Sequence, residues 1–267
     1  MTTPLAQLFK KTQSENRAAL IAYIPAGYPT QEGCKAVIDV FADAGVDAIE
    51  IGFPYSDPVM DGPTIQAAAV TALENGTGSA EVMSALKTAT DAGVAAVVMT
   101  YWNPIERFGV NEFAEAIAAN GGSGVITPDL TIEESAGWIA ATKKSAINPI
   151  YVVAPSTSDL RLPKVTSACG GFVYAASLMG VTGARNSVSS GAADLVARIR
   201  KTTDLPIAVG LGVSTREQAK GVAAYADGVI VGSAFIKALQ DAPSEEAGIA
   251  AVTELAQELA KGVREGR

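Results

Sequence analysis

Eight short apolar runs, separated by longer amphipathic segments, limit the folds open to this chain more than any other feature. The runs are Ala19–Ile24, Ala48–Gly52, Ala95–Tyr101, Gly124–Thr127, Pro149–Val153, Gly171–Ala175, Pro206–Gly210 and Gly228–Gly232. They are continuously apolar rather than alternating, which is typical of strands in a parallel sheet covered on both faces. The sequence therefore predicts eight buried strands joined by helices.

The segments between the runs have the apolar spacing of amphipathic helices. The candidates are Thr30–Ala44, Ser79–Ala92, Asn111–Ala119, Ile132–Lys144, Gly191–Thr202, Thr215–Ala224 and Ser244–Arg264. In Asp43–Gly52 and in Asp91–Thr100, a glycine follows the helix and the chain turns directly into the next strand. Glycine is favoured at that position because it adopts the left-handed conformation without strain. This recurrence indicates repeated helix-and-strand units.

The number and rhythm of these units favour one closed barrel. Eight units in about 250 residues is the size of a (β/α)₈ TIM barrel, and the chain has 267 residues of which 48% are hydrophobic. A doubly wound open sheet is the alternative, but it would usually have fewer strands and a glycine-rich turn after the first. Here Pro25-Ala-Gly-Tyr-Pro29 follows the first run. We predict an α/β fold, a single TIM-barrel domain over residues 1–267 with extra helices.

Composition excludes several classes of partner. Twenty basic and twenty-eight acidic residues give a net charge of −8, which disfavours a nucleic-acid partner. Cys34 and Cys169 lie far apart without metal-binding spacing and are expected to be reduced core residues. The N-terminus lacks the apolar core of a signal peptide, and no run approaches the roughly twenty residues needed to cross a bilayer. We expect a soluble, cytoplasmic protein without a membrane or nucleic-acid partner.

The chain contains no histidine, which narrows the chemistry open to it. Ser-His and Cys-His nucleophiles, imidazole bases and nearly every catalytic zinc site are excluded, so no metal site is expected. None of the predicted strands ends in a lysine, so a Schiff-base mechanism is poorly supported. Acid–base chemistry must therefore use carboxylates, tyrosines, lysines, backbone amides or water.

Acidic residues cluster around the end of the second run. Glu50 lies in that run, and Asp57 and Asp61 follow in a proline-rich loop. In a barrel, the carboxyl ends of the strands and the loops after them form the active face, so Glu50 and Asp61 are expected there. Buried acids are costly to desolvate, which suggests a catalytic role. Alternatively, Glu50 caps or salt-bridges a helix, and Asp61 caps the helix that starts near Thr64.

Glycines in the last third of the chain predict a phosphate site. The motifs are Val181-Thr-Gly183, Gly210-Leu-Gly212 and Gly232-Ser233, and the last precedes a short helix, Ala234–Leu239. Barrels often bind phosphate with the loops after strands 7 and 8 and the start of a short extra helix. Glycines let the backbone approach the oxygens, and a helix start supplies unpaired N–H groups. Two carboxylates facing a phosphorylated substrate suggest cofactor-free proton transfer.

Other residues have two interpretations each. Tyr101 and Tyr174 are expected to end strands 3 and 6, where their hydroxyls would reach the pocket or their rings would fill the core. Asn103-Pro104 is interpreted as a turn. The segment from Ser177 to Asn186 fits a mobile lid or an ordinary loop.

The sequence resembles the α subunit family of tryptophan synthase over essentially the whole chain. The matching motifs are Glu50-x-Gly-x-Pro-x-Ser-Asp-Pro-x-x-Asp-Gly-Pro-Thr-Ile-Gln66, Gly180-Val-Thr-Gly183, Gly210-x-Gly212 and Gly232-Ser233-Ala234. The resemblance implies retro-aldol cleavage of indole-3-glycerol phosphate to indole and glyceraldehyde 3-phosphate. It also implies an αββα (α₂β₂) assembly with a β subunit that carries pyridoxal phosphate, and no cofactor in this chain.

The resemblance assigns roles residue by residue. Glu50 would move the protons, Asp61 would stabilise charge on the ring nitrogen, and Thr182 would meet Asp61 when a lid closes. Tyr174 would support the glycerol or Glu50. The expected indole pocket is Tyr23, Ile65, Met99, Tyr101 and Ile230; the expected phosphate positions are Gly183, Leu211, Gly212, Gly232 and Ser233; the expected partner contacts are Asp57, Pro58 and Thr131. Leu211 and Thr131 depart from the family, in which phenylalanine and proline are common there.

Two other functions stay open at this stage. One is an enzyme that works alone, either as a lyase that releases free indole or as another phosphate-binding barrel with carboxylate chemistry. The other is a catalytically idle subunit that activates a partner. The presence of both Glu50 and Asp61 argues against the idle subunit, because an activator needs neither acid.

Overall fold

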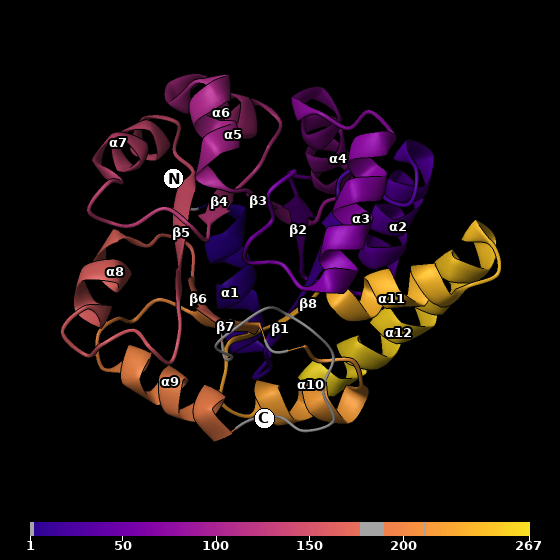
Figure 1. Ribbon diagram of the computed structural model, residues 1–267. Coiled ribbons are helices and arrows are strands. Elements are labelled where there is room, and N and C mark those ends of the chain that lie inside the picture. Colours follow the sequence, from indigo (N-terminus) through magenta and orange to yellow (C-terminus); the bar gives the residue numbers. More distant parts are fainter. Residues whose placement is uncertain (1–2, 177–189, 211) are drawn as a thin grey trace.

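The computed structural model describes residues 3–176, 190–210 and 212–267. In these ranges the strands run parallel in chain order around a closed barrel, and pairing of the first with the eighth closes it. Figure 1 shows the helices arranged around this ring. The strands are β1 Ala19–Pro25, β2 Ala48–Gly52, β3 Ala95–Met99, β4 Gly124–Thr127, β5 Asn148–Val153, β6 Val173–Ala176, β7 Ile207–Gly210 and β8 Gly228–Val231. The predicted (β/α)₈ barrel is confirmed.

The helices follow the expected rhythm with some additions. They are α1 Pro4–Ser14, α2 Gln31–Asp43, α3 Pro63–Glu74, α4 Ser79–Asp91, α5 Trp102–Phe108, α6 Val110–Ala119, α7 Ala136–Lys144, α8 Leu162–Ala168, α9 Ser190–Arg200, α10 Arg216–Ala223, α11 Ser233–Asp241 and α12 Glu245–Glu265. Helices α1, α5 and α8 were not expected from the sequence. Helix α7 starts at Ala136 rather than Ile132, because hydrogen-bonded turns occupy the preceding residues. In the described ranges no helix is both long enough and apolar enough to cross a membrane.

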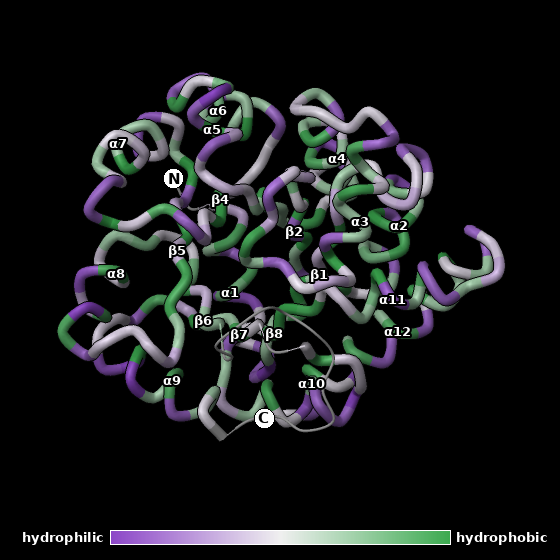
Figure 2. The backbone as a smooth tube through the Cα atoms, viewed as in Figure 1, coloured by the Kyte–Doolittle hydropathy of each residue, from purple (hydrophilic) through white to green (hydrophobic). Residues whose placement is uncertain are grey.

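Alternate residues of each strand face two different cores. Ile21 of β1, Val97 of β3 and Ile150 of β5 belong to a cluster inside the barrel, whereas Leu20 and Val98 pack in the layer between barrel and helices. Successive strand residues point to opposite faces, which accounts for the division. Figure 2 shows hydrophobic residues concentrated along the strands and polar ones on the outer loops. Because both faces of the sheet are buried, the sequence of each strand is continuously apolar.

Helix α1 closes the barrel at the amino ends of its strands. The Thr3 hydroxyl accepts a hydrogen bond from the Ala6 N–H at 3.3 Å and so caps the helix. Leu5 and Phe9, one helical turn apart, join the inner cluster, and the Phe9 ring centroid lies 5.8 Å from that of Phe172. With this end plugged, a substrate can enter the barrel from the carboxyl ends of the strands.

Candidate active site

A cavity at the carboxyl ends of the strands brings together residues that lie far apart in sequence. Its volume is about 70 Å³. Among the described residues, its lining is Tyr23, Glu50, Asp61, Ile65, Met99, Tyr174, Gly210, Gly212, Ile230, Gly232 and Ser233. This set includes both predicted catalytic acids and most of the predicted substrate-binding residues. No basic side chain is among these lining residues, which agrees with the weak support for a lysine mechanism.

Glu50 projects into the barrel from the middle of β2. It pairs in register with Tyr23 of β1 and Val97 of β3. Ala48, two residues earlier in the same strand, belongs to the cluster inside the barrel, so the Glu50 side chain also points inward. The residue is 1% exposed, and among the described residues its Oε2 has no hydrogen-bond partner. Burial, and next the charge of Asp61, raise the pKa of Glu50 to about 8. A buried carboxyl with an unpaired oxygen suits a proton donor that is neutral near pH 7.

Asp61 lies at the end of the loop that connects β2 to α3. Its Oδ2 accepts a hydrogen bond from the Tyr101 hydroxyl at 3.1 Å. Burial raises the pKa of Asp61 to about 6, and the Tyr101 hydrogen bond opposes that rise. The capping interpretation of Asp61 is wrong, because the N-cap of α3 is Gly62 and not Asp61. Asp61 is therefore more readily ionised than Glu50 while facing the same cavity.

Two tyrosines extend between these acids and the cavity wall, and glycines make room for their hydroxyls. A Cβ on Gly52 would lie 2.3 Å from the Tyr23 hydroxyl, and one on Gly210 would lie 2.5 Å from the Tyr174 hydroxyl. Burial, followed by the charges of Glu50 and Asp61, raises the pKa of both phenols well above 10. The hydroxyls therefore stay protonated and can donate hydrogen bonds. The spatial role of these two glycines was not anticipated from the sequence.

The expected phosphate positions are divided between described and undescribed residues. Gly212 has a positive φ of 61°, which favours glycine there. Gly232 is the N-cap of α11 without a side-chain cap, and Ser233 is the first residue of that helix. The N–H groups of a helix's first turn have no acceptor within the helix and attract anions. Thr182, Gly183 and Leu211 lie outside the described residues.

Tyr101 differs from its sequence expectation. Strand β3 ends at Met99, so Tyr101 lies beyond it as the N-cap of α5. Asn103-Pro104 is part of α5 rather than a turn, because proline is tolerated in the first turn of a helix. Tyr101 reaches the site through its hydroxyl, which contacts Asp61. Tyr174 is the second residue of β6 rather than its last.

The predicted partner contacts lie in loops that follow strands. Asp57 is exposed and Pro58 half-buried in the loop after β2, and Thr131 is exposed in the loop after β4. Both loops leave the carboxyl ends of their strands, and the cavity opens at that end of the barrel.

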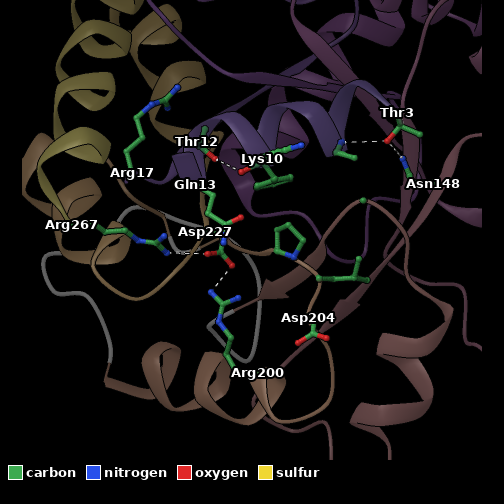
Figure 3. Close-up of a pocket in the computed structure, with 15 residues that line it drawn as sticks. Thr3, Lys10, Thr12, Gln13, Arg17, Asn148, Arg200, Asp204, Asp227 and Arg267 are labelled. Atoms are coloured by element: carbon green, nitrogen blue, oxygen red, sulfur yellow. Dashed lines mark hydrogen bonds and ion pairs between the residues drawn. The ribbon is translucent and has the colours of Figure 1, made fainter. Parts of the chain in front are cut away.

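A larger cavity of about 350 Å³ lies at the opposite end, beside α1. Figure 3 shows that Arg200 and Arg267 converge there on Asp227, and both are ion-paired with it. Thr3 and Asn148 are hydrogen-bonded at 3.4 Å on another side of the cavity. These contacts join α1 and the C-terminal residue to the barrel. The larger volume therefore lies away from the two carboxyls of raised pKa.

Comparison with known proteins agrees with this geometry. Residues 9–264 match the family model described as tryptophan synthase alpha chain. A tryptophan synthase alpha chain from Streptomyces avermitilis is 54% identical over 263 residues, which cover 98% of this chain and 95% of that protein. Another, from Mycobacteroides abscessus, is 51% identical over 266 residues and 99% of each chain.

Solved structures give the same result. A structure of Mycobacterium tuberculosis tryptophan synthase matches with a TM-score of 0.93 and 46% identity over 99% of each chain. A mutant tryptophan synthase α subunit from Pyrococcus furiosus matches with a TM-score of 0.83 and 33% identity, over 91% of this chain and 98% of that one. The chain therefore belongs to the tryptophan synthase alpha chain family, the lyases that cleave indole-3-glycerol phosphate to indole and glyceraldehyde 3-phosphate in tryptophan biosynthesis.

Proposed function

We propose that Glu50 and Asp61 carry out this cleavage by carboxylate acid–base chemistry, with no cofactor in this chain. The observation that carries the proposal is the pair of carboxyls facing one cavity with different pKa values, about 8 for Glu50 and about 6 for Asp61. Near pH 7 the first is mostly protonated and the second mostly ionised. Two titratable groups separated in this way indicate which acts as the acid.

Glu50 moves the protons in this mechanism. Its protonated carboxyl donates to C3 of the indole ring, which leaves a positive charge on the ring nitrogen. The resulting carboxylate then accepts the proton of the hydroxyl on the adjacent glycerol carbon. The bond between that carbon and C3 breaks, its electron pair returns to the ring, and the carbon becomes the aldehyde of glyceraldehyde 3-phosphate. Glu50 is protonated again at the end, so the cycle is complete.

Asp61 stabilises the intermediate. Its carboxylate accepts a hydrogen bond from the ring N–H and offsets the positive charge that develops when C3 is protonated. That charge would be costly in a cavity lined largely by buried groups. Cleavage therefore requires ionised Asp61 and protonated Glu50, and kcat/KM, which reports the free enzyme, should be bell-shaped in pH with limbs at about 6 and about 8.

The remaining lining residues bind substrate in this proposal. Tyr23, Ile65, Met99, Tyr174 and Ile230 surround the indole ring and the glycerol chain, supported by their position around the cavity. The phosphate binds at Gly212, Gly232 and Ser233, supported by the left-handed glycine and the start of α11. Roles for Thr182, Gly183 and Leu211 stay predictions.

We further propose that the chain assembles with a tryptophan synthase β subunit that carries pyridoxal phosphate, as an αββα heterotetramer. Asp57, Pro58 and Thr131 would contact that subunit. Exposed apolar side chains in the loops after β2 and β5 support a docking face at this end, because Val59 is 73% and Leu160 87% exposed. Docking there would place the partner beside the cavity that releases indole.

Single substitutions test the catalytic roles. Glu50→Gln and Asp61→Asn should each lower kcat for indole-3-glycerol phosphate by at least ~10²-fold, the lower range for a positioned acid–base group. Binding of a non-cleavable substrate analogue should stay nearly intact. The measurement is steady-state release of indole by the full chain, alone and with the β subunit. Near-normal turnover of either variant removes that residue from the mechanism, and unchanged activity on adding the partner contradicts the subunit proposal.

A further inference from the structure

The hydroxyl of Tyr101 joins the catalytic loop at two points. It accepts a hydrogen bond from the Met60 backbone N–H at 2.9 Å and donates one to Asp61 Oδ2 at 3.1 Å. The residue is 6% exposed and precedes α5, whereas Met60 and Asp61 belong to the loop after β2. One phenol from a neighbouring strand unit therefore holds consecutive residues of that loop.

The hydrogen bond from Met60 determines which group donates in the hydrogen bond between Tyr101 and Asp61. A backbone N–H can only donate, so the phenol oxygen accepts there and its single proton remains for the carboxylate. The ring itself is held as well, since the Tyr55 ring centroid lies 5.3 Å away with an interplanar angle of 32°. Tyr101 therefore presents a donor in a fixed orientation.

The main chain of Asp61 is fixed from another side. The Gln66 side-chain amide donates to the Asp61 backbone carbonyl at 2.9 Å. With Oδ2 used by Tyr101, the other carboxylate oxygen has no hydrogen-bond partner among the residues described, and the side chain lines the cavity. Among the described residues, the titratable groups that face this cavity with Asp61 are Glu50, Tyr23 and Tyr174.

We propose that Tyr101 is a positioning residue for the cleavage reaction: its hydroxyl orients Asp61 so that one carboxylate oxygen stays free for the ring N–H of the substrate. The proposal rests on the role proposed for Asp61 above. Tyr101 acts through the carboxylate and needs no contact of its own with the reacting atoms. Because Met60 lies in the loop that carries the proposed partner contacts, the same hydrogen bonds also fix Asp61 relative to that loop.

The charge of Asp61 supports the same assignment. Burial raises the pKa of Asp61 and the Tyr101 hydrogen bond lowers it, while no cation is among the described lining residues. Glu50 is mostly neutral near pH 7 and both lining phenols are neutral, so they add little opposing charge. Loss of the Tyr101 hydroxyl should therefore raise the pKa of Asp61 and move the acid limb of the kcat/KM profile to higher pH.

Tyr101→Phe tests the proposal, because it removes the hydroxyl and keeps the ring. We expect kcat for indole-3-glycerol phosphate to fall at least about 10-fold, as for loss of one hydrogen bond to a charged group. KM should change less than about 3-fold, since substrate binding depends on other residues. Tyr225→Phe is the matched control, because the Tyr225 hydroxyl, just before β8 at the amino end of the barrel, is buried and has no hydrogen-bond partner in the described part of the chain. Both variants should unfold near the wild-type temperature.

A double variant separates positioning from a general structural effect. In the Asp61→Asn background, Tyr101→Phe should lower kcat no further, because the residue acts through the aspartate. Equal additional losses in both backgrounds would overturn the proposal, as would a normal kcat or an unmoved acid limb in Tyr101→Phe. If Asp61→Asn itself turns over normally, the role proposed for Asp61 fails instead. If Asp61→Asn is severely impaired and Tyr101→Phe is normal, only the positioning role fails.

Discussion

Replacing Glu50 with glutamine should make the protein more stable at high pH, although the same change removes catalysis. Glu50 is 1% exposed, and its pKa is raised from an ordinary value of 4.5 to about 8. Between these values the folded protein keeps a proton that the unfolded chain releases. The stabilisation that the neutral Glu50 carboxyl gives to the folded state is therefore complete below pH 4.5, and it is lost as the pH rises through 8.

The size of the effect follows from the two pKa values. Their difference, at about 1.4 kcal/mol for each pH unit, corresponds to roughly 5 kcal/mol lost above pH 8, of which roughly 3 kcal/mol is already lost at pH 7. Glutamine is neutral at every pH and avoids the loss. The difference in unfolding free energy between Glu50→Gln and wild type should therefore grow by roughly 4 kcal/mol from pH 4.5 to pH 9.

Urea unfolding at pH 5, 7 and 9 measures this difference by linear extrapolation. In the difference between variant and wild type, the contributions of the titrating groups that both proteins share cancel. Glu254→Gln is the control, because Glu254 is exposed on α12 and stays in water, so the substitution should change stability by no more than about 0.5 kcal/mol. If the Glu50→Gln difference stays within about 1 kcal/mol between pH 5 and 9, Glu50 ionises freely in the fold and the argument from burial is wrong.

Two further substitutions test how the site and the barrel floor are built. Gly52→Ala would place a methyl group 2.3 Å from the Tyr23 hydroxyl and push that ring into the cavity, so steady-state assays should show kcat/KM at least about 10-fold lower. Gly221→Ala is the control and should have near-normal kcat/KM, because no described atom lies within 4 Å of the new methyl group. Equal effects of the two substitutions would contradict the steric argument. Arg17→Met should cost about 3–5 kcal/mol in urea unfolding, because it leaves the Asp47 carboxylate, whose side chain is only 11% exposed, without the guanidinium that contacts it at 2.6 and 2.7 Å. A loss below about 1 kcal/mol would show that the pair is well solvated.

The strands and the barrel could be predicted from the sequence because burial on both faces leaves a direct signal. Continuous apolar runs mark the strands, and their ends differ from the observed ones by two residues or fewer. Helix α1 has no continuous apolar run, because only a narrow face of it is apolar. The role of that face depends on tertiary packing, in which Leu5 and Phe9 join Phe172 inside the barrel. The shortest helices, α5 and α8, span one to two turns and leave too short a periodic pattern.

The sequence by itself determined which acids end up at the active face, because Glu50 lies in a strand and Asp61 in the loop after it, and a barrel gathers such positions at one end. Tertiary structure alone decided how those acids differ. The surroundings of Glu50 Oε2, which has no partner within the ranges that the structure describes, and the hydrogen bond from Tyr101 to Asp61 depend on neighbours contributed by other strand units. Forty residues separate Tyr101 from Asp61. Protonation depends on local desolvation and on nearby donors, and neither is defined until the barrel closes.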